Sequence, residues 1–278
     1  MLPAALVDRV LARLALPAGI AADLAGLERV YRAWSRHVPF DNLQKRAWHA
    51  APQGPLPGGD ARAFFASFLD EGSGGTCWAT SLALYSLLRT LGFPAQRAAG
   101  TMVGGPTVPP PEQMLTHGTV LVRFDGVDHL VDTHILTGEP LPLIPGATTA
   151  VQGPFGARAM PGDVGGALFR VWFSPHAGRP EMSCLLQKLD TDDDFHRERH
   201  ERSRATGPFN GQSYVRRQTA DGHRLMLLGQ RVEVAPDGTA TPTPLGDRGA
   251  RDAYLAYLGY APSLIARVPD DEPLVPPG

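Results

Sequence analysis

The chain has 278 residues and a mass of 29.8 kDa, and its 43% hydrophobic and 19% charged residues suit a folded protein with a substantial core. Its 31 glycines and 27 prolines follow no three-residue period, which excludes a collagen-like structure and predicts many turns. A net charge of −2 and a pI near 6.5 exclude the strongly basic surface on which nucleic-acid binding depends.

Apolar runs and cysteine content narrow the class of protein further. No apolar run reaches the roughly 18 residues of a membrane-spanning helix. A signal peptide needs an uninterrupted apolar segment near its start, and here Asp8 and Arg9 interrupt that segment. The two cysteines, Cys77 and Cys184, form neither a disulfide framework nor a C-x-x-C zinc motif. Because so few cysteines are typical of the cytoplasm, we expect a cytoplasmic protein without metal, membrane or nucleic-acid partners.

The N-terminal third is predicted to be helical. Apolar residues recur at helical spacing over residues 2–16 and 21–37. A short helix is expected after Asp60, a residue suited to cap it, and an amphipathic helix over residues 77–91. We therefore expect a helical bundle here.

Strand patterns replace the helical spacing in the middle of the chain. The predicted strands are residues 95–103, 117–124, 127–132, 167–173 and 181–189. Asp125-Gly126 predicts a tight hairpin turn between the second and third of these strands. We expect a small antiparallel β-barrel.

The C-terminal third mixes helices and strands. Residues 190–204 are highly charged and predict a solvated helix, and the further elements are strands at 213–218, 223–228 and 230–235 and a helix at 247–258. The fold class is thus predicted to be α+β, with helices at 1–92, a β-barrel at 93–190 and a mixed α/β part at 191–278.

Cys77 is the first candidate for chemistry. It follows a Gly-Ser-Gly-Gly segment and begins a predicted helix, where unpaired backbone N–H groups and the helix dipole favour a thiolate. The same N–H groups are suited to an oxyanion hole. The alternative is a buried structural cysteine on an apolar helix.

The predicted hairpin supplies two further candidates. With the turn at Asp125-Gly126, Asp132 lies opposite Thr119, so His117 and Asp132 become diagonal neighbours on one face. A carboxylate beside an imidazole fixes its tautomer and supports the imidazolium, which can pair with a thiol. Cys77, His117 and Asp132 are therefore the predicted catalytic residues.

Two other residues have predicted roles. His134 falls on the same face as His117, and we expect it to face solvent beyond the strand end, with a pocket-lining role as the alternative. Cys184 alternates with Met182 and Leu186 in an apolar strand and is expected in the core.

Three segments resemble the arylamine N-acetyltransferase family. RHVPFDNLQKR at 36–46 resembles its H-x-P-F-E-N-L signature, and residues 72–93 resemble its segment around the nucleophilic cysteine. Residues 116–132 resemble the strand pair that carries its histidine and aspartate, and SRATGPFN at 203–210 resembles the region after its barrel. The resemblance extends over about residues 1–260.

The resemblance implies a helical first domain, a β-barrel and an α/β lid around a core like that of papain and transglutaminases. It also implies a Cys77–His117–Asp132 triad. The implied activity is acyl transfer from a thioester to an amine through a cysteine acyl-enzyme. Acetyl-CoA would be the co-substrate, a small-molecule amine the acceptor, and no cofactor would be permanently bound.

Several positions depart from the motifs of that family. The family has Arg where Ser73 stands, Glu and Asn where Ala79 and Ser81 stand, and a different sequence where Thr133-His134 follows Asp132. Asp41 therefore lacks the arginine that its counterpart would meet. These departures leave three alternatives open: an amide synthase fed by an acyl carrier protein, a transglutaminase-like amidase or peptidase, and a non-catalytic binding protein.

Overall fold

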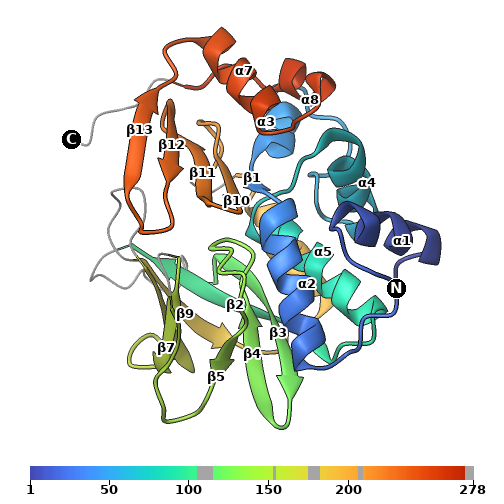
Figure 1. The fold of residues 1–278 in the computed structure, drawn as a ribbon, viewed down its shortest axis with the longest axis vertical. Helices are drawn as coiled ribbons and strands as arrows, with labels where there is room; N and C mark the ends of the chain where they lie inside the picture. The colour runs from blue at the N-terminus through green and yellow to red at the C-terminus, as the bar shows by residue number, and fades with distance from the viewer. Residues whose placement is uncertain (105–114, 153–154, 175–181, 206–208, 273–278) are drawn as a thin grey trace.

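The computed structural model describes residues 1–104, 115–152, 155–174, 182–205 and 209–272 of the chain. Figure 1 shows the N-terminal helices on the right, a large curved sheet at the lower left, and another sheet at the upper left with the last helices above it. The N-terminal helices contact both sheets, so residues from all three parts of the chain meet at their common boundary.

The N-terminal helices are α1 (Ala4–Arg13), α2 (Leu24–His37), α3 (Leu43–Ala50), α4 (Ala61–Glu71) and α5 (Cys77–Thr90). Helices α1, α2 and α4 each bury a stripe of regularly spaced apolar residues, and α5 is buried over most of its length. Asp60 caps α4 by accepting from the backbone N–H groups of Arg62 and Ala63, as its position predicts. The sequence pattern did not predict α3.

The large sheet is antiparallel and consists of β2 (Ala95–Val103), β3 (His117–Phe124), β4 (Val127–Val131), β5 (Leu141–Leu143), β6 (Thr149–Val151), β7 (Ala157–Pro161), β8 (Phe169–Phe173) and β9 (Met182–Lys188). Strands β5 and β6 are the two edges of this sheet, and contacts of β5 with β6 and β7 bring these edges together into a nearly closed barrel. Cys184 is buried among the apolar residues of this sheet, as predicted. Val120 pairs with Val131, which confirms the register predicted from the Asp125-Gly126 turn.

The smaller sheet joins distant parts of the chain. Its order is β1 (Phe40–Asp41), β10 (Val215–Thr219), β11 (Gly222–Leu227), β12 (Gln230–Val234) and β13 (Ala240–Pro244). Phe40 pairs with Arg216 and Asp41 with Val215, so a short segment between α2 and α3 becomes the edge of a C-terminal sheet. This edge strand was not predicted.

The remaining helices are α6 (Asp193–Arg202), α7 (Arg248–Tyr257) and α8 (Pro262–Arg267). The charged helix α6 begins with acidic residues, as expected, yet it also buries His196 and His200 against the N-terminal part. Among the described helices, none combines the length and the apolar character needed to cross a bilayer.

The predicted α+β fold, with N-terminal helices, a central antiparallel barrel and a C-terminal α/β part, is confirmed. The predicted domain boundaries at 92 and 190 stay a prediction. Strand β1 shows why boundaries are not obvious here, since it lies in the first segment of the sequence and in the last sheet of the structure.

Candidate active site

Cys77 is the first residue of α5, and the glycines before it are set by close packing. A β-carbon at Gly74 would lie 1.8 Å from the carbonyl oxygen of Pro39, which no side chain can tolerate. A β-carbon at Gly75 would lie 2.9 Å from the β-carbon of Ala79. Glycine is therefore required here so that the chain entering α5 can pass close to the segment before β1.

The first turn of α5 differs from that of most other helices. Helices α2, α4, α6 and α7 each begin after an aspartate whose side chain accepts a first-turn N–H. Thr76, the N-cap of α5, makes no cap hydrogen bond within the described residues. The N–H groups beside Cys77 are thus available to a negative charge, either on its sulfur or on an oxygen bound next to it.

The hairpin brings His117 and Asp132 together as predicted. His117 begins β3, and its Nε2 lies 2.6 Å from Oδ2 of Asp132, with both side chains at most 4% exposed. The other carboxylate oxygen, Oδ1, accepts from the backbone N–H groups of His134 at 2.8 Å and Ile135 at 3.1 Å. With both oxygens engaged, the carboxylate holds the imidazole in one orientation.

Cys77 completes this series from the helical side. It lines the same cavity as His117, and its Sγ lies 3.9 Å from the carbonyl oxygen of Thr116, the residue before His117. Since Asp132 occupies Nε2 of the imidazole, Nδ1 is the nitrogen left for the thiol. The structure therefore brings His117 into contact with Asp132 and places Cys77 and His117 at the same cavity.

The electrostatics of the pair follow from its burial and its charges. Burial would lower the pKa of His117, but the charge and hydrogen bond of Asp132, together with Cys77, raise it well above its ordinary value. Burial would raise the pKa of Asp132, yet the charge and hydrogen bond of His117 bring it below its ordinary value. The charge of Asp132 thus favours the protonated form of His117.

A cavity of about 400 Å³ opens beside Cys77 and His117. Phe40, Phe209 and Tyr214 form an aromatic wall with edge-to-face contacts, their ring centroids 5.2 to 5.7 Å apart. The described part of the lining contains no Asp, Glu, Lys or Arg. The described residues also hold no group of three His, Cys, Asp or Glu arranged to bind a metal ion. The cavity thus suits a neutral, flat molecule.

The expectation that His134 faces solvent is wrong. Its side chain is buried and lines this cavity, with ring centroids 4.6 Å from Phe40 and 6.0 Å from His117. The strand register stops applying because residues 133–135 form a turn that folds back over the Asp132 carboxylate. For residues 106–115, which run into His117, the sequence leaves open a loop that shapes the pocket entrance or a stiff surface connector, and all of them but Leu115 lie outside the described part of the chain.

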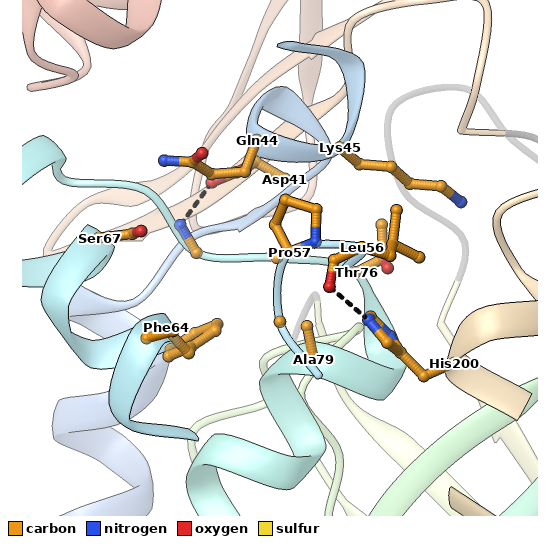
Figure 2. A pocket seen from close by; sticks show the side chains of 14 residues that line it. Asp41, Gln44, Lys45, Leu56, Pro57, Phe64, Ser67, Thr76, Ala79 and His200 are labelled. Atoms are coloured by element: carbon orange, nitrogen blue, oxygen red, sulfur yellow. Dashed lines mark hydrogen bonds between the residues drawn. The ribbon is translucent and has the colours of Figure 1, made fainter. Parts of the chain in front are cut away.

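A smaller cavity, of about 60 Å³, lies next to the entry into α5 (Figure 2). Asp41 lines it and accepts hydrogen bonds from the N–H groups of Gly74 at 2.7 Å and Leu43 at 3.1 Å. The hydroxyl of Tyr260 donates to the same carboxylate at 3.0 Å. Tyr260 thus partners the Asp41 carboxylate, and no sequence motif revealed this contact.

The chain was compared with known proteins. It matches a family model described as N-acetyltransferase over residues 23–247. It is 32% identical to an arylamine N-acetyltransferase of Mycolicibacterium smegmatis over 126 residues, which span 44% of this chain and 43% of the relative. The chain therefore belongs to the arylamine N-acetyltransferase family.

Solved structures agree on the fold. An arylamine N-acetyltransferase from Mycobacterium abscessus superposes with a TM-score of 0.77 at 18% identity, covering 94% of this chain and 93% of that one. One from Salmonella typhimurium gives a TM-score of 0.76 at 19% identity, covering 96% and 98%. At these identities the likeness shows the fold, and the chemistry must be argued from the residues of this chain.

Proposed function

We propose that the protein transfers an acetyl group from acetyl-CoA to a small aromatic amine through an acetyl thioester on Cys77. The observation that carries the proposal is the buried 2.6 Å hydrogen bond between His117 and Asp132, beside the cavity that His117 and Cys77 both line. A carboxylate, an imidazole and a thiol in this series are the arrangement that activates a cysteine nucleophile.

In the first half-reaction the Cys77 thiolate attacks the acetyl carbonyl carbon of acetyl-CoA. The oxygen that becomes negative faces the uncapped N–H groups of the first α5 turn. The bond from carbon to the coenzyme sulfur then breaks, and the imidazolium of His117 gives its proton to the leaving thiolate. Acetyl-Cys77, neutral His117 and free coenzyme A remain.

In the second half-reaction an amine attacks the acetyl carbon of the Cys77 thioester. Neutral His117 accepts a proton from the amine nitrogen, so the new carbon–nitrogen bond forms as a neutral amide. The carbon–sulfur bond to Cys77 breaks, and the thiolate and imidazolium are restored. Asp132 keeps the imidazole oriented throughout, because its other oxygen is fixed by two backbone N–H groups.

The proposed acceptor is an amine on an aromatic ring. A ring can stack on the aromatic wall of Phe40, Phe209 and Tyr214, while its amine points toward acetyl-Cys77. The described lining offers no charged Lys, Arg, Asp or Glu side chain, which favours an amine that is neutral at physiological pH.

We further propose that the reaction takes place in the cytoplasm with no resident cofactor. Both cysteines of the chain are free thiols, and both are buried. Cys77 must stay reduced to act as a nucleophile, and a reducing compartment keeps it so.

The test is intact mass spectrometry after incubation with acetyl-CoA and no amine. We expect a single acetyl adduct in the wild type, none in Cys77→Ala, and loss of the adduct when aniline is added. The matched control Cys184→Ala should be acetylated like the wild type. An adduct that persists in Cys77→Ala, or a wild type that never accepts acetyl, would contradict the proposal. If only longer thioesters bound to a carrier protein acylate the protein, acetyl-CoA is wrong as the donor, but Cys77 stands as the nucleophile.

A further inference from the structure

A buried pair of threonine hydroxyls joins α5 to the turn that follows β4. Oγ1 of Thr80, on α5, lies 2.7 Å from Oγ1 of Thr133, the residue directly after Asp132. The exposed fraction is 1% for Thr80 and 0% for Thr133. Because neither hydroxyl can bond to water instead, the hydrogen bond between them is costly to break.

The direction of this hydrogen bond follows from the other partners of the two hydroxyls. Thr80 Oγ1 also lies 3.0 Å from the carbonyl oxygen of Thr76 and 3.3 Å from that of Cys77, and a carbonyl oxygen can only accept. Among the described residues, the hydroxyl of Thr133 bonds to Thr80 alone. Thr133 therefore donates to Thr80, and Thr80 donates to the two carbonyl groups.

This series of hydrogen bonds connects the two halves of the candidate active site. At one end, the Thr80 hydroxyl bonds to the backbone of Cys77. At the other end, Thr133 lies in the turn whose backbone N–H groups bind Oδ1 of Asp132, and the other oxygen of that carboxylate binds His117. Any shift of α5 against this turn would change the position of Cys77 relative to His117.

Elsewhere α5 meets the barrel by close packing against β2 and β3. Gly118, next to His117, leaves room for the helix, because a β-carbon there would lie 2.5 Å from Cε3 of Trp78 and 3.0 Å from Oγ of Ser81. Packing of this kind brings the helix close to the strand, but apolar contacts have little directional preference. A hydrogen bond has a preferred length and angle, so the threonine pair can fix the helix along its axis.

We propose that Thr80 and Thr133 are positioning residues, whose hydrogen bond fixes the first turn of α5 against the turn after Asp132 and so keeps Cys77 aligned with His117. Neither hydroxyl lines the described part of the cavity, so the pair acts through the other residues and not on the substrate. Thr133 stands where the sequence departs from the family motif, which makes this support a feature of this chain. The proposal rests on the proposed function, in which Cys77 is acetylated.

The experiment measures single-turnover acetylation of Cys77 at several acetyl-CoA concentrations, together with the melting temperature of each variant. Thr80→Val and Thr133→Val each replace a hydroxyl by a methyl group of similar size, and the double variant replaces both. Thr133→Ser keeps the hydroxyl. Ser86→Ala is the matched control, because the Ser86 hydroxyl also lies on α5 but donates within the helix, to the carbonyl oxygen of Leu82 at 2.7 Å.

We expect the three valine variants to differ in stability. Thr80→Val should lower the melting temperature most, because it leaves the Thr133 hydroxyl buried without a partner. Thr133→Val should lower it less, because Thr80 still donates to the two carbonyl groups. The double variant leaves no hydroxyl unpaired, so its melting temperature should return toward that of the wild type.

The rate of acetylation should not follow these differences in stability. All three valine variants should acetylate Cys77 about 10- to 100-fold more slowly than the wild type at saturating acetyl-CoA, because a misplacement of about 1 Å can cost about 10² in rate. The half-saturating acetyl-CoA concentration should stay unchanged. Thr133→Ser and Ser86→Ala should react at the wild-type rate.

The double variant separates positioning from stability. Slow acetylation at a restored melting temperature supports the proposal. If its melting temperature and its rate both return to the wild-type values, or if only the half-saturating concentration changes, the positioning role is overturned. If Thr80→Val does not fold, Thr133→Val and the double variant provide the same comparison.

The two proposals fail in different ways. If the wild type is acetylated at Cys77 and the valine variants react equally fast, the role of the threonine pair is overturned and the nucleophile stands. If acetyl-CoA never acetylates Cys77 in the wild type, the proposed function itself is overturned.

Discussion

Asp41 and Asp132 are two buried aspartates near α5, and their carboxylates differ in one hydrogen-bond partner. Asp41 and Asp132 each accept two backbone N–H groups at 2.7 to 3.1 Å. Asp41 adds the neutral hydroxyl of Tyr260, whereas Asp132 adds the imidazole of His117. Burial raises the pKa of Asp41 to about 6, but the pKa of Asp132 is lowered because the charge and hydrogen bond of His117 outweigh its burial.

This comparison shows what a buried carboxylate needs in order to stay ionised. Neutral donors satisfy the oxygens of Asp41 but do not offset the loss of water around its charge. A cation at hydrogen-bond distance does so for Asp132. The pKa shifts therefore favour an ionised carboxylate at Asp132, beside His117, and bring the carboxyl group of Asp41, beside the small cavity, close to its titration point in mildly acidic solution.

The largest expected effect comes from Asp132→Asn. The amide cannot support the imidazolium and favours the wrong tautomer of His117, so kcat should fall by about 10³- to 10⁴-fold, as the same change does in serine triads. Steady-state acetylation of an arylamine measures it. Asp41→Asn is the matched control and should stay within about tenfold of the wild type, because Asp41 touches no reacting group. Equal losses in the two variants would remove the distinction between the two aspartates.

The next effect is on stability as a function of pH. The pKa of Asp41 is about 6 in the folded protein against an ordinary 3.8, so the folded state binds this proton more tightly than the unfolded chain. The contribution of Asp41 therefore falls as pH rises from about 4 to 6, by about 3 kcal/mol at most. His117 contributes in a higher window, since its raised pKa gives stability below about pH 6.5 that is lost at higher pH.

Asp41→Asn should remove the decline between pH 4 and 6 and leave the decline at higher pH in place. Urea unfolding at several pH values measures both windows in one series. A variant that retains the full wild-type decline in the lower window would show that Asp41 does not titrate there.

The smallest expected effects are on the free energy of unfolding, for variants of the two tyrosines that hydrogen-bond to these aspartates. Tyr260 donates to the Asp41 carboxylate, whereas Tyr31 donates to the backbone carbonyl of Asp132 at 2.6 Å. Tyr260→Phe and Tyr31→Phe should each lower the free energy of unfolding by about 1 kcal/mol. Only Tyr260→Phe should also move the lower pH window upward, because it removes a donor from the ionised carboxylate. Identical pH profiles in the two variants would contradict this assignment.

The sequence predicts the parts of the site that local rules govern. The Asp125-Gly126 turn fixes the register of one hairpin, and that register brings His117 to Asp132. Cys77 at a helix N-terminus follows from glycines and helical spacing in one short segment. The positions of these elements are determined by residues that are close in the sequence.

Other parts of the site depend on contacts that sequence periodicity does not contain. Tyr260 reaches Asp41 from the far end of the chain, and α3, which follows Asp41, is too short to show a clear apolar stripe. His134 was misplaced because the rule of alternating faces ends with β4, where the chain turns. Each of these residues acquires its role from a partner distant in sequence or from an irregular turn.

The pairing of β1 with β10 has a consequence for the order of assembly. During synthesis, Phe40 and Asp41 leave the ribosome long before Val215 and Arg216, which pair with them. The loop before Cys77 depends on this edge strand, since Gly75 bridges to Phe40 and Gly74 bonds to Asp41. A nascent chain therefore carries the thiol without its finished surroundings, which are complete only when the C-terminal sheet closes a long loop of the fold.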